Sequence, residues 1–583
     1  MSRRLAWSLA LALAASLTGG VATGADLVGW GADVNPGSGP VLIDSVRGDL
    51  AAIVKAAPAA RTGLVAAFVR ERGLAGIEAV KRFRNPELKE LLVALLGHDD
   101  WRVKHRALFA LEYYGDPAVL AQAWPLMKAD VPRLREKAAI TCIKLWDAKA
   151  GAAAAGGDAA AAVAALLRSE TDDHVRSCLD ALADRIAGKL KPERTYTEFL
   201  RADPDGLRWT PFLEGMDKAA QVAPGYAKKG VSKGGGGDAS KLGPSPRWTT
   251  PLLGQPDEEV KGTSLQPFAN LRSNGTVHHT GLDVGACLDG AGFYAAADGY
   301  VRWVMSGSDM GTLFVLQHST DGNETVNAVY MHGGDTAFVT GGDKVRAGQL
   351  IGTMGMSYSI ENGGHFAHLH YGLYPGNFSE THNYGYKPVS AGLADWIDPA
   401  KFLPFWVERT RPLVGALRPV DAALAKAASA VRDGALGRAW TEASKVAERA
   451  DASDAQKADA AYVQAQIAAG AEEAGRRATA QRDAGWPASA LSLLQRAAAD
   501  MKNVPAAARL AADAAQWAKD PAFVRALKAE TAFDLASAKA AKMAEKKEPA
   551  DKVRAVFEDL LRDFGDTSLK ARIDERIAAL TAK

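Results

Sequence analysis

Histidine and aspartate residues with the spacing of a metal site gather in one stretch of this chain. Eight of its 11 histidines lie between His278 and His382, far more than an even spread would place there. The stretch opens with His279-Thr-Gly-Leu-Asp283 and ends with His368-Leu-His370. Imidazoles and a carboxylate without paired cysteines are typical ligands of a catalytic zinc site, where three protein ligands leave one position for water. The sequence therefore predicts such a site here.

The spacing also indicates which elements must hold these side chains. Residues two apart face the same way on a strand, so His368 and His370 project together while Leu369 points into a core. His279 and Asp283 also share one face of an extended segment, but a straight strand would hold their Cα atoms about 13 Å apart. Gly281, midway between them, permits the bend or bulge that brings both side chains to one ion.

The two motifs and three segments between them are similar to one known family. His-x-x-x-Asp, followed about 85 residues later by His-x-His, resembles the lysostaphin-type zinc endopeptidases, which cut peptidoglycan peptides. The resemblance covers about residues 265–405 and implies an all-β antiparallel catalytic domain. The intervening matches are Ala295–Val301, Val329–His332 and the hairpin Gly342–Gly352.

The resemblance implies roles for the histidines. His279, Asp283 and His370 would bind Zn²⁺, with a water in the fourth position. His368, on the same strand face, would act as a general base or stabilise the oxyanion. The family's additional active-site histidine corresponds to His332, which would share this work. His318 is a weaker candidate for a supporting role, and we interpret His278, His365 and His382 as neighbours of the site.

Hydrolysis of peptide cross-links in peptidoglycan is the activity that this interpretation favours. The alternative is a non-catalytic regulator of the same fold, which recruits or activates another wall hydrolase. Such regulators typically lack one or more ligands, and none is missing here. A zinc carboxypeptidase of a related fold would need a longer His-to-Asp interval and usually an acidic residue in place of His368. The sequence leaves open whether meso-diaminopimelate-type cross-links or glycine bridges are cut.

Three details depart from the family pattern. Gly333 follows the middle histidine, where the family usually has leucine, the segment Cys287–Tyr294 is less regular than the usual turn, and the insertion Ser319–Asn327 lengthens a hairpin. We expect these differences to affect how a substrate fits more than how the metal is bound.

The first 24 residues have the composition of a secretory signal. A basic start is followed by the apolar segment Leu5–Leu17 and by small residues up to Ala25. This apolar segment is too short to span a membrane comfortably, which favours a cleaved signal peptide, residues 1–24, over an uncleaved anchor. We therefore expect an exported protein of the periplasm or the cell wall, with no transmembrane segment after cleavage.

Residues 25–222 are predicted to form a helical domain of HEAT-like repeats. Asp100, Asp130 and Asp172 each precede an apolar helix, at uneven intervals that resemble those of repeats stacked into a solenoid. The sequence does not decide between a solenoid that binds a protein partner and one that spaces or stabilises the enzyme.

A glycine-rich segment follows the predicted repeats. Residues 223–248 include Lys233-Gly-Gly-Gly-Gly-Asp238, a composition typical of a flexible linker. We therefore expect the repeats to be separate from the catalytic domain, residues 249–408, and we expect residues 244–405 to fold alone.

Residues 412–583 are alanine-rich and are predicted to form an all-α domain. Val553, Phe557 and Leu560 follow the helical period, and Gly565 and Asp566 mark the boundary with a last helix. Paired helices of this kind resemble tetratricopeptide-like arrays, which favours an interaction or scaffold role. The chain is thus predicted to be multidomain, with an α-helical repeat domain, an all-β catalytic domain and an all-α C-terminal domain.

Charge and cysteine content exclude or leave open the remaining possibilities. A net charge of +2, with no clustered basic run, argues against nucleic acid as a partner. The chain has three cysteines, Cys142, Cys178 and Cys287, so one disulfide is possible in an exported protein and at least one thiol stays free.

Overall fold

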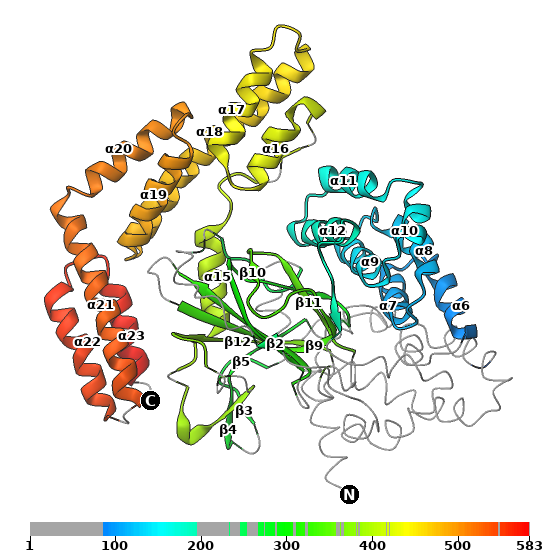
Figure 1. The fold of residues 1–583 in the computed structure, drawn as a ribbon. Helices are drawn as coiled ribbons and strands as arrows, with labels where there is room; N and C mark the ends of the chain where they lie inside the picture. Colours follow the sequence, from blue (N-terminus) through cyan, green and yellow to red (C-terminus); the bar gives the residue numbers. More distant parts are fainter. Residues whose placement is uncertain are drawn as a thin grey trace, which may run out of the picture. The chain divides into compact units, whose positions relative to one another are not determined.

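The computed structural model describes residues 86–194 and, with short gaps, residues 245–581, together with residues 64 and 232–233. The predicted signal peptide and nearly all of the predicted linker lie outside these residues. The chain divides into two compact units, the first made mainly of residues up to Pro404 and the second mainly of residues from Phe405. Helical repeats, an antiparallel β domain and a C-terminal helical region follow one another along the chain, as the sequence predicts (Figure 1).

Short antiparallel helices form the N-terminal part of the first unit, which we call the repeat layer (residues 86–186). Asp100, Asp130 and Asp172 each precede a helix, as the sequence predicts. Asp100 caps α7 and Asp172 caps α12 by accepting hydrogen bonds from backbone N–H groups of the first helical turn. Asp130 does not cap a helix, because α9 begins at Pro132 after the uncapped Val131. The helices are α6 (Pro86–Leu95), α7 (Trp101–Glu112), α8 (Leu120–Leu126), α9 (Pro132–Leu145), α10 (Ala148–Ala155), α11 (Ala159–Ser169) and α12 (Asp173–Ile186).

The β domain is built on an antiparallel sheet with the strand order β10-β7-β8-β9-β11-β6, to which β12 and β5 add beside β9. Three short strands form a second sheet, in the order β13-β4-β3. The strands are β3 (Leu271–Arg272), β4 (Val277–His279), β5 (Gly281–Val284), β6 (Gly292–Tyr294), β7 (Gly299–Ser306), β8 (Thr312–Ser319), β9 (Thr325–Ala337), β10 (Lys344–Val345), β11 (Leu350–Met354), β12 (Leu369–Pro375) and β13 (Tyr386–Pro388).

Strand β9 changes partners along its length. Its first half, from Val326 to Met331, pairs with β12, whereas its second half, from Gly333 to Ala337, pairs with β11. His332 lies between the two halves and has a positive φ of 66°. The long strand therefore bends at a residue that the sequence singled out for chemistry.

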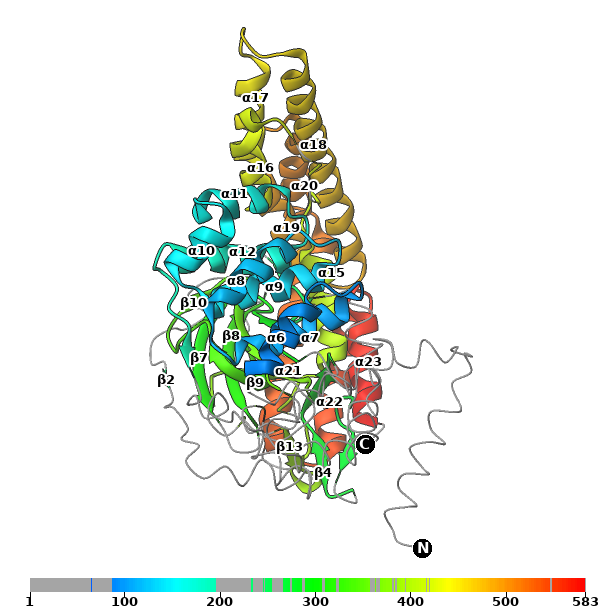
Figure 2. The same cartoon turned by 90° about the vertical axis from the view of Figure 1, so that its right-hand side faces the viewer.

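The repeat layer and the β domain share one hydrophobic core. Tyr294, Phe338 and Leu350 of the β domain are buried in the same cluster as the apolar residues of α6 to α12. Figure 2 shows the repeat layer stacked beside the sheet. The strand β1 (Glu193–Arg194), which follows the repeat layer directly, adds to β9, and β2 (Ser232–Lys233) adds to β7. The expected separation of the two regions is therefore corrected, because their described parts pack into one unit.

The second unit consists of paired helices. The helix α15 (Pro399–Thr410) ends the β domain and leads into them. Alanine dominates their buried faces, which allows the helices to approach closely. The helices are α16 (Ala425–Arg432), α17 (Leu436–Ala447), α18 (Asp454–Asp483), α19 (Pro487–Asp500), α20 (Ala508–Trp517), α21 (Pro521–Glu545), α22 (Ala550–Phe564) and α23 (Lys570–Thr581).

The structure describes two of the three cysteines and the helices that could be tested for membrane crossing. Cys142 and Cys178 are both buried free thiols, and Cys287 lies outside the described residues. Within the described part of the chain, no single helix is long and apolar enough to cross a membrane, although α10 and α11 together meet that test as a pair bent by 55°.

Candidate metal centre

The pairing of two strands brings the motifs together. In the antiparallel pair of β5 and β12, His370 lies directly opposite Asp283. Directly opposed residues of an antiparallel pair project to the same face, so both side chains point to one side of the sheet. Asp283 is also held from its other edge, because its N–H donates to the carbonyl of Gln266 at 3.0 Å. The backbone that carries the Asp283 carboxylate is therefore hydrogen-bonded along both of its edges.

The chain changes sheets between His279 and Asp283. Strand β4 ends at His279 in the small sheet, and β5 begins at Gly281 in the large sheet, with Thr280 between them. This change of sheet supplies the bend that the sequence required. Gly281 serves a second purpose, because a Cβ there would lie 2.6 Å from Nε2 of His370. A glycine is needed so that the His370 ring can approach the backbone.

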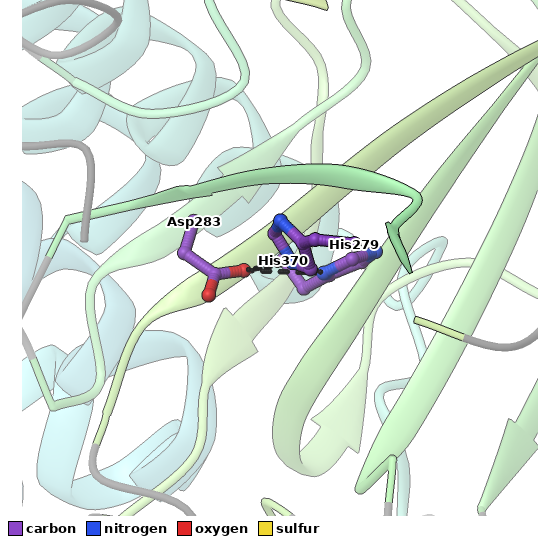
Figure 3. A group of neighbouring side chains, drawn as sticks. All are labelled: His279, Asp283 and His370. Atoms are coloured by element: carbon purple, nitrogen blue, oxygen red, sulfur yellow. Dashed lines mark hydrogen bonds and ion pairs between the residues drawn. The ribbon is translucent and has the colours of Figure 1, made fainter. Parts of the chain in front are cut away.

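His279, Asp283 and His370 form a tight, buried group (Figure 3). The separation between His279 Nε2 and His370 Nδ1 is 2.9 Å. Each of these nitrogens also lies 3.1 Å from Asp283 Oδ1. Ligand atoms around a tetrahedral zinc ion, with bonds of about 2.0–2.2 Å, are separated by only slightly more than this. The three atoms thus have the spacing of one face of a metal-coordination tetrahedron.

The protonation of His279 strengthens this interpretation. Its Nδ1 lies 3.0 Å from the carbonyl oxygen of Pro267, which can only accept a hydrogen bond, so Nδ1 carries the proton. In the neutral ring, Nε2 is then the nitrogen that can bind a metal. The residues therefore fit a divalent metal held by two imidazoles and one carboxylate.

Electrostatics keep the Asp283 carboxyl ionised. Burial alone would raise its pKa, but the neighbouring His368, His279 and His370 lower the pKa well below its usual range. A carboxyl group binds metal in its deprotonated form. Asp283 is therefore held in the state that a ligand must have.

His368 and His332 lie beside this group without belonging to it. His368 Nε2 is 3.6 Å from Asp283 Oδ1, which is too long for a hydrogen bond. The rings of His332 and His368 have centroids 4.4 Å apart, and His332 lies 6.3 Å from the ring of His370. The structure thus brings all five residues predicted from the sequence to one site.

His332 has an unusual backbone. On a regular strand it would face away from Met331 and hence away from His370, which lies opposite Met331. The positive φ at His332 turns its side chain back to the metal side. Such a conformation costs a β-unbranched residue about 1–2 kcal/mol and is found where the surroundings impose it. His332 Nδ1 donates to the carbonyl of Asn362 at 3.0 Å, which leaves Nε2 as the acceptor of the neutral ring.

The remaining histidines of the stretch lie apart from the group. His318 is fully buried, with Nδ1 3.2 Å from the carbonyl of Asp298, and its ring packs against Trp248. His382 binds Asp395 and stacks on Tyr374. His278, on β4, contacts the carbonyl of Ala269, and His365 lies outside the described residues. A supporting role for His318 at the metal group is not apparent in these contacts.

Two residues at the site have no signal in the sequence. Tyr386, 40 % exposed, lies on β13 directly opposite His279, and the ring centroids are 5.5 Å apart. Its hydroxyl donates to Gln266 Oε1 at 3.2 Å. Asn362, which holds His332, is fully buried. Asn362 lies in an irregular connection and Tyr386 on the three-residue strand β13, and no periodic pattern predicts either, although the aromatic run around Tyr386 is a weak indication of a binding surface.

Comparison with known families agrees with this geometry. Residues 277–382, which contain all five site residues, match the family model of peptidase family M23. Residues 69–144 match the model of HEAT repeats. This range includes α6, α7, α8 and most of α9. The chain therefore carries a lysostaphin-type M23 domain next to HEAT repeats. Among curated proteins, none matches this chain.

Proposed function

We propose that this protein is a zinc-dependent endopeptidase that hydrolyses peptide cross-links of peptidoglycan. The proposal rests on one observation. Three potential ligand atoms lie 2.9–3.1 Å from one another in the buried group of His279, Asp283 and His370. The match to an M23 domain supports the substrate class. The signal-like first 24 residues support export, so we propose that the enzyme works in the periplasm or the cell wall.

The side chains around the group are suited to the proton transfers of hydrolysis. Zinc held by the three ligands would supply a polarised water and a Lewis acid for the scissile carbonyl. His332 can accept a proton at Nε2, because its Nδ1 proton is committed to Asn362. His368, next to both His332 and Asp283, can stabilise negative charge on the carbonyl oxygen or share the proton.

Hydrolysis requires one proton to pass from the attacking water to the leaving amine nitrogen. The oxygen of water forms a bond to the carbonyl carbon, and its proton passes to one of these histidines. The same histidine then donates that proton to the leaving amine nitrogen as the C–N bond breaks. No residue of the described site other than these two histidines has been assigned to this transfer.

Digestion of purified peptidoglycan tests the proposal. We expect the metal-loaded protein to release muropeptides whose masses correspond to hydrolysed cross-links, and a chelator should abolish the release. Asp283→Ala is the matched control, since it should lose metal and activity together. The product masses also identify the bond that is cut.

A binding protein without catalysis would give a different result. If the wild-type protein holds one zinc per chain and binds peptidoglycan but releases no product, the regulator becomes the better description. If it neither binds zinc nor cleaves peptidoglycan, both descriptions fail.

A further inference from the structure

The repeat layer meets the β domain close to His332. Phe109 and Tyr113 of α7 form a buried apolar cluster with Met356, which follows β11. The two aromatic rings pack edge to face, with centroids 5.2 Å apart. Met356 is 1 % exposed, so the contact fixes the position of its backbone.

A second contact from the repeat layer reaches the backbone paired with this segment. Lys137 of α9 is fully buried, lies over the ring of Phe109 and donates to the carbonyl of Gly290 at 3.3 Å. Gly290 N–H in turn donates to the carbonyl of Met354 at 3.0 Å, and Met354 N–H donates to Ala291 at 2.8 Å. The backbone at residues 354–356 is therefore held by two helices of the repeat layer.

This segment contacts both groups that orient His332. Gly355 N–H donates to the carbonyl of His332 at 2.9 Å. Gly355 also packs directly against Asn362, because a Cβ at Gly355 would overlap the side chain and Cα of that residue. Asn362 supplies the carbonyl that accepts the Nδ1 proton of His332. Movement of Met356 would consequently disturb the hydrogen bond that defines the His332 tautomer.

We propose that Met356 is a positioning residue, through which the repeat layer fixes the conformation and tautomer of His332. The repeat layer is then a structural part of the active site and more than a spacer. This inference rests on the proposed function for its catalytic consequence, but the tautomer itself does not. Because the positive φ of His332 is unfavourable for this residue, it persists only while its surroundings are rigid.

The test compares substitutions that loosen the same interface at different places. Met356→Ala removes the side chain that contacts Phe109 and Tyr113, and Met356→Leu restores most of its volume. Leu350→Ala is the matched control, because Leu350 lies in the core shared with the repeat layer but does not contact Asn362 in any described hydrogen bond. Bound zinc, kcat, KM and melting temperature are measured on each full-length protein.

We expect Met356→Ala to keep its zinc and its KM and to lose about 10- to 100-fold in kcat, the usual effect of misplacing a proton-transfer group. Met356→Leu should recover most of the loss. Leu350→Ala should lower the melting temperature while kcat below that temperature stays near the wild-type value. Equal kcat losses in Met356→Ala and Leu350→Ala, or none in Met356→Ala, would overturn the proposal.

The imidazole ¹⁵N chemical shifts of His332 report its tautomer without any need for catalysis. The His332 signal is identified as the one that disappears in His332→Gln. Wild-type protein should show His332 protonated at Nδ1, and Met356→Ala should show a mixture of tautomers. If the wild-type protein has no activity but these shifts change as expected, the proposed function fails and the positioning role stands. Tyr113→Leu, which alters the same contact from the repeat layer, replaces Met356→Ala if that variant does not fold. An unchanged His332 tautomer in the folded variant overturns the proposal.

Discussion

Two histidines separated by one residue are expected to do different work. His370 Nδ1 belongs to the metal group, whereas His368 Nε2 lies 3.6 Å from Asp283. His370→Ala should therefore lose both zinc and activity, because it removes one of three ligands. His368→Ala should keep zinc and lose about 10²–10⁴-fold in turnover, the usual contribution of a positioned acid or base. Zinc content by mass spectrometry and cleavage rate are measured on the same preparations.

The residue between them is the control for this prediction. Leu369 is fully buried on the opposite face of β12, so Leu369→Ala should reduce stability before it reduces activity. If His368→Ala lost its metal while His370→Ala kept it, the two roles would be reversed. Full activity in every variant would mean that this group is not the catalytic site.

A second residue-scale prediction concerns His318, whose pKa is lowered to about 4 by burial, against the opposing effect of the carbonyls of Asp298 and Ala297. The unfolded chain has a histidine pKa of about 6.5, so between pH 6.5 and 4 the unfolded state binds more protons than the folded state. His318 alone should therefore lower the unfolding free energy by about 3 kcal/mol as the pH is lowered through this window.

Denaturant unfolding at a series of pH values checks the His318 prediction. His318→Gln should remove about 3 kcal/mol of the difference between pH 6.5 and 4, while the contribution of His105, whose pKa is also lowered by burial, should remain. His98→Gln, a substitution of an exposed histidine, should keep the wild-type slope. A His318→Gln protein whose stability falls as steeply as that of the wild type would show that the loss arises elsewhere.

At the residue scale, the sequence predicts those site residues whose side-chain type and spacing alone indicate metal binding. The spacing of His279, Asp283 and His370 is enough to predict a shared ion, because strand periodicity fixes which side chains project together. The contribution of His332 follows from family resemblance, since a regular strand would turn it away. Asn362 and Tyr386 could not be predicted, because an irregular connection and a three-residue strand bring them to the site.

At the scale of elements, periodic patterns predict the strands and helices well. The hairpin that the insertion Ser319–Asn327 lengthens is formed by β8 and β9, and Val553, Phe557 and Leu560 line the buried face of α22. The limits of such patterns are visible at Gly565, which ends α22 with a φ of −66° and not in the left-handed conformation usual for a terminal glycine. Local signals give the position of the element but not its final geometry.

The loop before β6 supplies the element-scale prediction. Gly290 has a φ of 76°, and a Cβ there would overlap Phe109 and Lys137 of the repeat layer. Gly290→Ala should therefore destabilise the first unit by the strain of a positive φ, about 1–2 kcal/mol, plus the cost of displacing α7 and α9. The melting temperature of the full-length protein is the measurement.

Gly376→Ala is the control for the effect of the contact. Gly376 has a similar φ of 87° with open space where the Cβ would be, so its substitution carries the strain without the overlap. The two variants should differ clearly in melting temperature. Equal losses would mean that the loop and the repeat layer move apart at little cost.

At the scale of the whole molecule, charged residues of a helix are buried where the repeat layer meets the β domain. Glu136 and Lys137 of α9 have the appearance of a solvated face, yet both are fully buried against the β domain. The Tyr294 hydroxyl donates a hydrogen bond to Glu136 Oε1 at 2.5 Å, and Lys137 forms an ion pair of 2.6 Å with Glu112. Burial raises the pKa of Glu136 and lowers that of Lys137 to about 8. Charges are buried in this way where partners satisfy them, which no local pattern reveals.

This interface leads to the last prediction, which revises the expectation that residues 244–405 fold alone. Without the repeat layer, Tyr294, Phe338 and Leu350 would be exposed, and burial of three such side chains contributes about 5 kcal/mol. A loss of this size is comparable to the whole stability of a small domain.

Residues 244–405 should therefore melt at a clearly lower temperature than residues 25–405, and the longer fragment should unfold in one transition that includes both its helices and its strands. Circular dichroism during heating measures both quantities. Equal melting temperatures, or separate transitions for helices and strands, would show that the shared core does not couple the two regions and that the β domain is autonomous after all.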